Sequence, residues 1–170
     1  TTVLFDVQTK FKTDVEGVYE PKNYDLKERG PVTARSALAG SLNIPAVKMI
    51  YLTVIGNVLD LAEKMGYTTL KDRSRFGLSL VLGGGEIKLL EHAAAFGVFA
   101  AEGVHHDPVA ILKVEDKDGG LLEGWTQTDG TKAMDPEIAR NISSILSDND
   151  ARAYVFGEKN HLTLGDRPVA

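Results

Sequence analysis

A serine and an asparagine two positions apart are the residues of this chain best suited to act together on a substrate. Ser41 and Asn43 flank Leu42, at the point where one apolar segment ends and another begins. A hydroxyl group both donates and accepts hydrogen bonds, and a carboxamide does so from two separate atoms. Such a pair can pass a proton and hold a peptide backbone. An isolated Ser-x-Asn triplet also arises by chance, and its more ordinary meaning is a junction between two elements.

The residues around this pair predict two helices that meet there. Thr33 is a good N-cap for a first helix, whose apolar residues recur at helical spacing. Pro45 suits the first turn of a second helix but not its interior. Gly40 leaves room for another group beside the junction. We therefore expect Ser41 and Asn43 to lie between two helices, with their side chains facing a cleft.

The remaining patterns predict an α+β protein that is mostly helical. The segment over 89–101 is apolar around most of its circumference, which predicts a core helix. Another helix opens with an acidic cap and a proline, and its expected buried stripe is Ile138, Ile142, Ile145 and Leu146. The other expected elements are a strand over 3–7, a helix over 57–65 and a β-hairpin over 109–125.

Composition excludes several classes of function. The chain has 170 residues, of which 43% are hydrophobic and 25% charged, as is typical of a globular domain and not of a disordered one. Its net charge is −5 and it has no basic run, so we expect no nucleic-acid partner. Cysteine is absent, which excludes disulfides and thiolate chemistry. No apolar run approaches the length of a membrane span.

Other motifs favour structural roles. The glycines at 83–85 are followed by Glu86, not by the Lys-Ser or Lys-Thr of a phosphate-binding loop. No Gly-x-Ser-x-Gly elbow accompanies the four histidines, and no ligand series completes a metal site. A second Ser-x-Asn triplet, at 147–149, ends a predicted helix, where these residue types form turns. We therefore expect no cofactor and no metal.

Longer stretches resemble the transpeptidase domain of class A penicillin-binding proteins. They are RGPVTARSALAGSLNIPAVK, GLSLVLGGGEIKLLEHAAAFGVFAAEGV, SSILSDNDARAYVFG and LGDRPVA, with FDVQTKF and YEPKNYDLKERGPVT near the start. These enzymes carry Ser-x-x-Lys, Ser-x-Asn and Lys-Thr-Gly motifs, and only the second occurs here. We therefore expect residues 1–170 to be part of one transpeptidase domain, incomplete at both ends, lying between the first and third motifs.

The resemblance also decides between the two triplets. In the family, the middle motif precedes a helical subdomain and lies far upstream of Lys-Thr-Gly. This position corresponds to Ser41 and not to Ser147. The resemblance therefore implies a catalytic role for Ser41 in proton transfer and a substrate-binding role for Asn43, whose amide would hold the peptide. The nucleophilic serine and its lysine have no counterpart in this chain, so we expect the chain alone to be inactive.

The family further implies what the complete protein does. It would be a serine-type D,D-transpeptidase of a peptidoglycan synthase, cross-linking stem peptides that end in D-Ala-D-Ala through an acyl-enzyme. β-Lactams would bind because they imitate the peptide bond under attack. The implied fold is the serine transpeptidase/β-lactamase-like fold, an antiparallel sheet flanked by helices, to which this piece contributes mostly the helical subdomain. The implied location is extracytoplasmic, in the periplasm or on the outer face of the cell membrane, with an anchor elsewhere in the parent protein.

Two alternatives stay open at this point. One is a non-catalytic peptide-binding or scaffolding module that keeps the transpeptidase fold. The other is a D,D-carboxypeptidase of the same superfamily, in which water takes the acyl group. Neither needs a cofactor, and no feature of the sequence indicates an oligomeric state.

Overall fold

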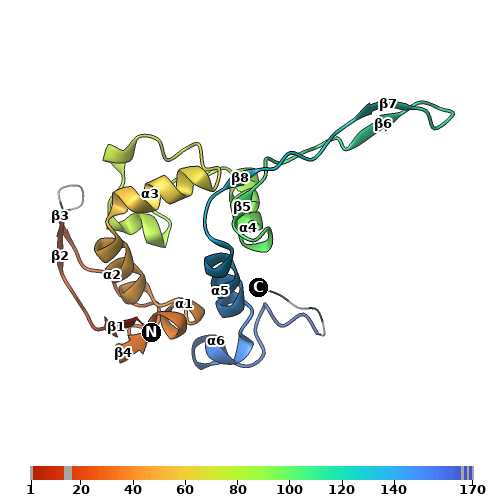
Figure 1. Ribbon diagram of the computed structural model, residues 1–170. Helices are drawn as coiled ribbons and strands as arrows, with labels where there is room; N and C mark the ends of the chain where they lie inside the picture. Colours follow the sequence, from red (N-terminus) through yellow and green to blue (C-terminus); the bar gives the residue numbers. More distant parts are fainter. Residues whose placement is uncertain (1, 14–16, 166, 168, 170) are drawn as a thin grey trace.

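The computed structural model describes residues 2–13, 17–165, 167 and 169. Within these residues the chain forms six α-helices, two short 3-10 helices and four separate two-stranded antiparallel ribbons (Figure 1). Helices make up the body of the molecule and the ribbons lie around it. The α+β, mostly helical architecture expected from the sequence is confirmed.

The helices begin and end close to the positions that their caps predict. Those expected over 57–65 and 89–101, and the one opening after Asp135, are found with ends shifted by at most two residues. The α-helices are α1 (Ala34–Ala39), α2 (Asn43–Thr53), α3 (Ile55–Lys64), α4 (Leu89–Ala100), α5 (Pro136–Leu146) and α6 (Asn149–Phe156). The 3-10 helices are η1 (Arg73–Arg75) and η2 (Leu78–Leu82).

Two ribbons come from the amino-terminal segment. β1 (Val3–Asp6) pairs along its whole length with β4 (Gly30–Thr33), and β2 (Phe11–Thr13) pairs with β3 (Gly17–Tyr19). The strand expected over 3–7 is confirmed. The other three strands had no sequence signal, because three or four residues are too few to establish an alternating pattern.

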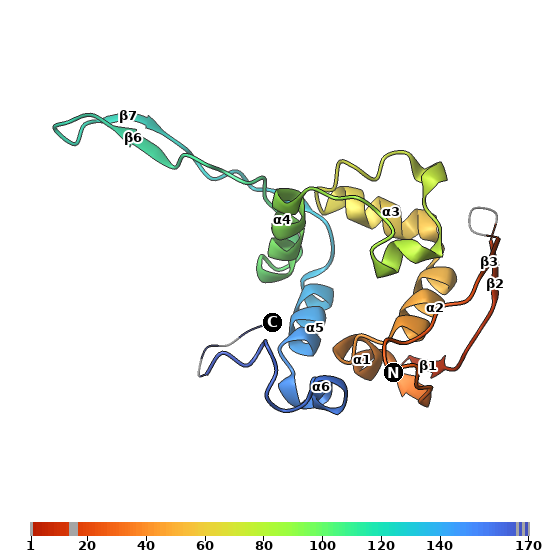
Figure 2. The ribbon, with the colours of Figure 1, turned by 180° about the vertical axis from the view of Figure 1, so that it is seen from behind.

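The predicted hairpin over 109–125 is also confirmed. β6 (Lys113–Glu115) pairs with β7 (Leu121–Gly124), and the ribbon projects away from the helical body in opposite views (Figures 1 and 2). At its base, β5 (Val104–His105) pairs with β8 (Thr131–Lys132). In the turn, Asp116 Oδ1 accepts hydrogen bonds from two backbone N–H groups at 2.8 and 2.7 Å. This carboxylate therefore shapes a turn.

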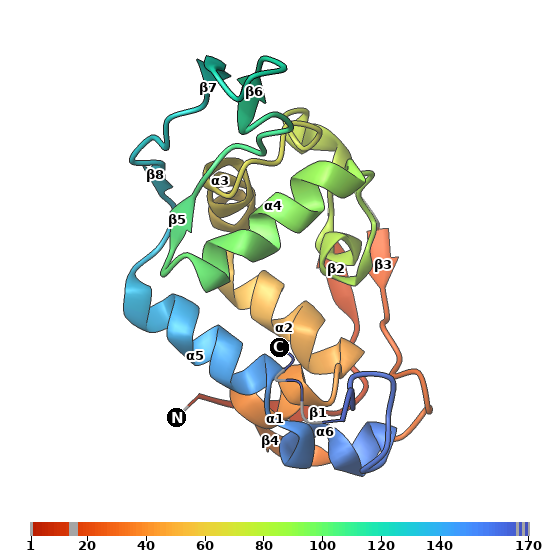
Figure 3. The same cartoon turned by 90° about the vertical axis from the view of Figure 1, so that its right-hand side faces the viewer.

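Helix α2 lies at the centre of the body, beside α1 and η2 (Figure 3). It is followed by Val54, whose φ of 67° lies in the left-handed region, and the axes of α2 and α3 are bent by 92° there. No single helix among the described residues is both long and apolar enough to cross a membrane; α2 and α3 meet that test only when counted together.

Three small apolar clusters hold these elements together. One cluster packs against α2, one against α3, and one joins α4 to the residues that follow β8. The first contains Phe11, Val47, Ile50 and Leu78; the second contains Leu59, Leu70 and Phe76; the third contains Met65, Ala95, Val98 and Ala133. Burying one side chain of this size contributes about 1.5–3 kcal/mol to the stability of the fold. Since Phe11 belongs to β2, the first cluster holds α2 against the β2–β3 ribbon.

The expectation that 89–101 is a core helix is wrong for this chain. In α4 only Ala95 and Val98 are buried, whereas Leu89 and Leu90 are 84% and 64% exposed. A helix that is apolar on all sides is expected to be buried, but the pattern does not indicate which neighbouring elements bury it. Here α5 and the base of the hairpin contact one side of α4.

The stripe expected on α5 is wrong at one position. Ile138 is 52% exposed, and the fully buried residue is Ala139. Ile142, Ile145 and Leu146 are half-buried. The helix contacts both α4 and α1, and a small residue lets two helices approach more closely than a branched one does.

Glu91 fixes the start of α4 to the preceding turn. Its carboxylate accepts from Lys88 Nζ at 2.8 Å and from Thr68 Oγ1 and N at 2.6 and 3.0 Å. The hydrogen bond from Lys88, followed by those from Thr68, lowers the pKa of Glu91 from 4.5 to about 2. The group therefore stays ionised well below neutral pH.

Candidate functional site

Helix α1 begins as its cap predicts and ends in a tight corner. Thr33 Oγ1 accepts a hydrogen bond from Ser36 N at 3.1 Å, which satisfies one of the free N–H groups of the first turn. At the other end, Gly40 N donates to Ser36 O at 2.9 Å. The helix is only six residues long, so its two ends are held by contacts around the same serine.

Ser41 occupies the left-handed position of a Schellman motif. Its φ is 51°, its N–H donates to Leu38 O at 3.0 Å, and Leu42 N donates to Ala37 O at 3.0 Å. This pair of bonds defines the motif, in which the left-handed residue is usually glycine. A residue with a Cβ costs about 1–2 kcal/mol in this conformation. Backbone strain of this kind is concentrated at functional sites, and here it falls on the predicted serine.

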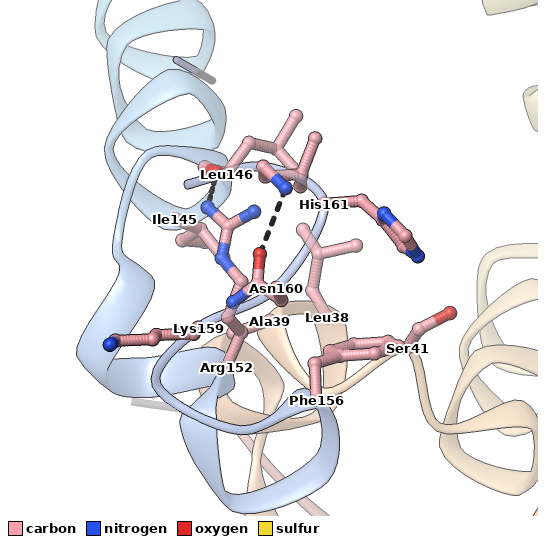
Figure 4. Close-up of a pocket in the computed structure, with 11 residues that line it drawn as sticks. Leu38, Ala39, Ser41, Ile145, Leu146, Arg152, Phe156, Lys159, Asn160 and His161 are labelled. Atoms are coloured by element: carbon pink, nitrogen blue, oxygen red, sulfur yellow. Dashed lines mark hydrogen bonds between the residues drawn. The ribbon is translucent and has the colours of Figure 1, made fainter. Parts of the chain in front are cut away.

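The corner exposes Ser41 and buries its neighbour. Leu42 is 4% exposed, whereas Ser41 is exposed and its hydroxyl makes no hydrogen bond within the described part of the chain. Ser41 lies at the edge of an open cavity of about 760 Å³ between α1, α5, α6 and the loop over 159–162. In Figure 4 its hydroxyl points away from Phe156, toward the side on which His161 also projects. The hydroxyl is therefore free to meet a group from outside this chain.

Asn43 is the first residue of α2, and the amino-terminal segment holds it in place. Its Nδ2 donates to Lys22 O at 2.9 Å. The N-cap residue of α2, Leu42, has no polar side chain, and Ile44 N donates instead to Asn23 Oδ1 at 3.2 Å. Residues 22 and 23 thus satisfy the start of α2 from outside the helix.

A buried carboxylate anchors this contact. Asp6 is fully buried and accepts from Asn23 Nδ2 at 2.7 and 2.9 Å and from Arg29 N at 3.1 Å. Burial alternates along β1, so Asp6 faces inward on the same side as Leu4. A buried carboxylate needs such partners to offset its loss of hydration. The sequence reasoning missed this network; its one signal was a charged residue in an apolar strand.

Ser41 and Asn43 come together at a second cavity. Its volume is about 480 Å³, and it lies between α1, α2, η2 and α5. Apart from these two residues and Thr53, all of its lining residues are apolar. The structure therefore brings the predicted hydroxyl and carboxamide to the rim of one largely apolar hollow, as their position at a helix junction suggested.

Comparisons with known proteins identify the relatives of this chain. No protein-family model matches it. Penicillin-binding protein 1A of Clostridium acetobutylicum is 32% identical over 170 residues, covering 97% of this chain and 20% of the relative. Penicillin-binding protein 1A of Aquifex aeolicus is 42% identical over 103 residues, covering 61% of this chain and 14% of the relative. The chain belongs to the class A penicillin-binding proteins. It is a portion of their transpeptidase domain and spans less than a quarter of the length of the curated relatives it matches.

Solved structures agree on the fold. Penicillin-binding protein 1A from Haemophilus influenzae superposes with a TM-score of 0.74 at 23% identity, covering 85% of this chain and 26% of that one. The penicillin-binding protein PonA1 from Mycobacterium tuberculosis gives a TM-score of 0.74 at 21% identity, covering 98% of this chain and 44% of that one. The helices and ribbons described above are therefore those of a penicillin-binding transpeptidase domain.

In this penicillin-binding protein portion, the second Ser-x-Asn triplet has structural partners. Ser147 ends α5, and Asp148 caps α6 by accepting from Ala151 N at 2.9 Å. Asn149 Nδ2 donates to Glu158 O at 2.9 Å. These are the turn and cap roles expected of such residues.

The histidines lie in different surroundings, although His105 and His106 are neighbours in the sequence. His92 Nδ1 lies 2.7 Å from the hydroxyl of Tyr67, and His105 packs against Gly66. His161 lines the same cavity as Ser41, together with the buried Arg152, and neither residue was singled out from the sequence. Among the described residues, no group of three or more His, Asp or Glu is arranged to hold a metal ion.

Proposed function

We propose that residues 1–170 belong to one transpeptidase domain of a peptidoglycan synthase and form one wall of its D,D-transpeptidase active site. The observation that carries this proposal is the Schellman corner. It presents Ser41 with a left-handed backbone, a hydroxyl that has no hydrogen-bond partner within the described residues, and access to an open cavity. The attacking serine and the lysine that activates it would come from another part of the protein, and no residue here takes those roles.

Ser41 would act in proton transfer. In the reaction, a serine attacks the carbonyl of the penultimate D-alanine, forming an acyl-enzyme and releasing the terminal D-alanine, and the amine of a second stem peptide then takes the acyl group. A hydroxyl that donates and accepts can carry the proton from the activating lysine to the departing amine. The Ser41 hydroxyl has no hydrogen-bond partner within the described residues, which supports this role, because both its donor and its acceptor capacity remain available.

Asn43 would hold the substrate peptide. One N–H of its amide is engaged by Lys22 O, which leaves the second N–H and Oδ1 for a ligand. One donor and one acceptor on a single plane match the C=O and N–H groups of an extended peptide. The contact with Lys22 fixes the orientation of the amide before the substrate arrives, which lowers the entropic cost of binding.

The partners of this site would be stem peptides ending in D-Ala-D-Ala, and β-lactams in their place. Structures of penicillin-binding protein A from Mycobacterium tuberculosis are described as acyl-enzyme complexes with β-lactams, and PonA1 is described in complex with penicillin V. They share the fold at TM-scores of 0.71–0.72. We propose that the site lies outside the cytoplasm, on a protein anchored in the membrane.

The test uses the complete protein and the rate of acylation by a fluorescent penicillin. Ser41→Ala should reduce the rate, and Asn43→Ala should reduce it roughly 5- to 150-fold, the equivalent of about 1–3 kcal/mol for a lost amide contact. Ser147→Ala is the matched control, because it removes a hydroxyl from the second triplet, and it should leave the rate unchanged. Wild-type acylation in both Ser41→Ala and Asn43→Ala would refute the assignment.

The same assay separates the alternatives. The 170-residue chain alone should show no covalent label, because the proposed nucleophile is not in it. A complete protein that binds stem peptides without labelling would be a scaffolding module. Rapid deacylation by water, with no transfer to an acceptor amine, would indicate a D,D-carboxypeptidase.

A further inference from the structure

Tyr154 reaches from α6 to the last turn of α1. Its hydroxyl donates to Ser36 O at 2.7 Å. The same carbonyl accepts from Gly40 N at 2.9 Å, the bond that closes α1 immediately before the left-handed corner. Partial burial raises the pKa of Tyr154, so the phenol keeps the proton that it donates. A side chain 118 residues away in sequence thus stabilises the end of the helix that presents Ser41.

Gly40 makes this approach possible. A Cβ at position 40 would overlap the hydroxyl oxygen of Tyr154. The φ of Gly40 is −84°, which any residue adopts, so the glycine is not needed for its backbone conformation. It is needed for space. The tyrosine hydroxyl therefore lies directly over the residue that precedes Ser41.

Two arginines hold Tyr154 and the start of α6 in place. The guanidinium of Arg29 lies over the Tyr154 ring, 5.6 Å from its centroid. Arg35, on α1, pairs with Asp148 at 3.1 Å and donates to Ser144 Oγ at 2.8 Å. Arg29 therefore contacts the ring face of Tyr154. Helix α6, which carries Tyr154, is also bound to α1 through the Arg35–Asp148 pair, and this link does not depend on the tyrosine hydroxyl.

We propose that Tyr154 is a positioning residue for Ser41. By holding Ser36 O and filling the space over Gly40, it keeps the strained corner in the conformation that leaves the serine hydroxyl exposed and available to a group from outside this chain. This inference rests on the proposed function of Ser41. Tyr154 is assigned no contact with substrate, and its effect on the reaction would pass through Ser41 alone.

A double-mutant cycle tests this coupling in the complete protein. The measurement is the second-order rate constant for acylation by a fluorescent penicillin, with thermal melting as a check on folding. Tyr154→Phe keeps the ring and its Arg29 contact and removes the hydrogen bond. It should slow acylation roughly three- to tenfold. In the Ser41→Ala background the same change should have less than about a twofold effect.

Controls separate this inference from the function on which it rests. Tyr51→Phe, an exposed tyrosine on α2, should leave acylation unchanged, and Gly40→Ala should slow it by displacing Tyr154. Two results would refute the positioning role while leaving the proposed function intact, provided that Ser41→Ala slows acylation. One is that Tyr154→Phe slows acylation by the same factor in the wild-type and Ser41→Ala backgrounds. The other is that Tyr154→Phe does not slow acylation at all. If Ser41→Ala has no effect, the proposed function fails and this inference with it.

Discussion

Replacing Ser41 by glycine should make the transpeptidase domain more stable and less active. The residue sits at φ 51° in a position where glycine is the usual occupant. Its hydroxyl makes no hydrogen bond within the described residues, so its removal takes nothing from the fold. Stability and activity are therefore expected to change in opposite directions at one residue.

The size of the stability gain follows from two opposing terms. Relief of the left-handed strain contributes about 1–2 kcal/mol. Glycine also gains freedom in the unfolded chain, which costs about 0.4–1 kcal/mol. The net gain for Ser41→Gly is therefore between about 0 and 1.6 kcal/mol, with a midpoint of about 0.8 kcal/mol. Ser41→Ala keeps the Cβ and its strain, so it should leave stability within about 0.5 kcal/mol of wild type.

Both variants are compared by denaturant unfolding and thermal melting of the complete domain. A gain of 1 kcal/mol corresponds to about 2–4 °C for a domain of 150–250 residues. Both variants should also lose penicillin acylation to a similar extent, since both lack the hydroxyl. A glycine variant less stable than the alanine variant would refute the strain argument. A glycine variant that acylates at the wild-type rate would refute the role of the hydroxyl.

Three further predictions concern the stability of the fold. Asn23→Ala should destabilise the protein by about 2–3 kcal/mol in urea unfolding, because it removes the hydrogen bonds that Asn23 Nδ2 donates to the buried Asp6 and the acceptor of Ile44 N in the first turn of α2; a change below about 0.5 kcal/mol would contradict this account. Since the pKa of Glu91 is lowered to about 2, its contribution to stability is complete above pH 4.5 and is lost as the pH falls toward 2. Glu91→Gln should therefore melt below wild type at pH 6, and the gap should close between pH 5 and 2; a gap independent of pH would count against the ionised contacts. Gly103→Ala should cost at least about 2 kcal/mol, because φ is 88° and a Cβ would overlap Met134 O, whereas Gly56→Ala, with open space around it, should be neutral or slightly stabilising; equal effects in thermal melts would show that the backbone conformation at 103 is not required.

Local chemistry was enough to predict where the site lies along the chain. Thr33 and Pro45 act within one helical turn, and both take the positions that their side chains favour. The helix junction, and with it the placement of Ser41 beside Asn43, followed from these two residues. The left-handed backbone of Ser41 did not follow, because serine has no strong preference for that region and the closing hydrogen bonds depend on how both helices pack.

Contacts between distant parts of the chain were the features that the sequence did not reveal. Asp6 and Asn23 are 17 residues apart, and Tyr154 and Ser36 are 118 apart. No spacing rule connects such pairs, since they meet only after the elements have packed. The exposure of Leu89 has the same origin: periodicity identifies an apolar face, and the neighbours of that face are decided by the tertiary structure.

The two ends of α2 restrict where residues can be inserted into this domain or deleted from it. The helix runs for 11 residues, about 16 Å, between two non-glycine residues with positive φ, Ser41 just before it and Val54 at its end. One added or deleted residue inside α2 would rotate everything beyond it by about 100°. Helix α3 follows directly after Val54, so no loop separates the two helices that could compensate for this rotation. Insertions and deletions should therefore be tolerated in the projecting hairpin and excluded from α2.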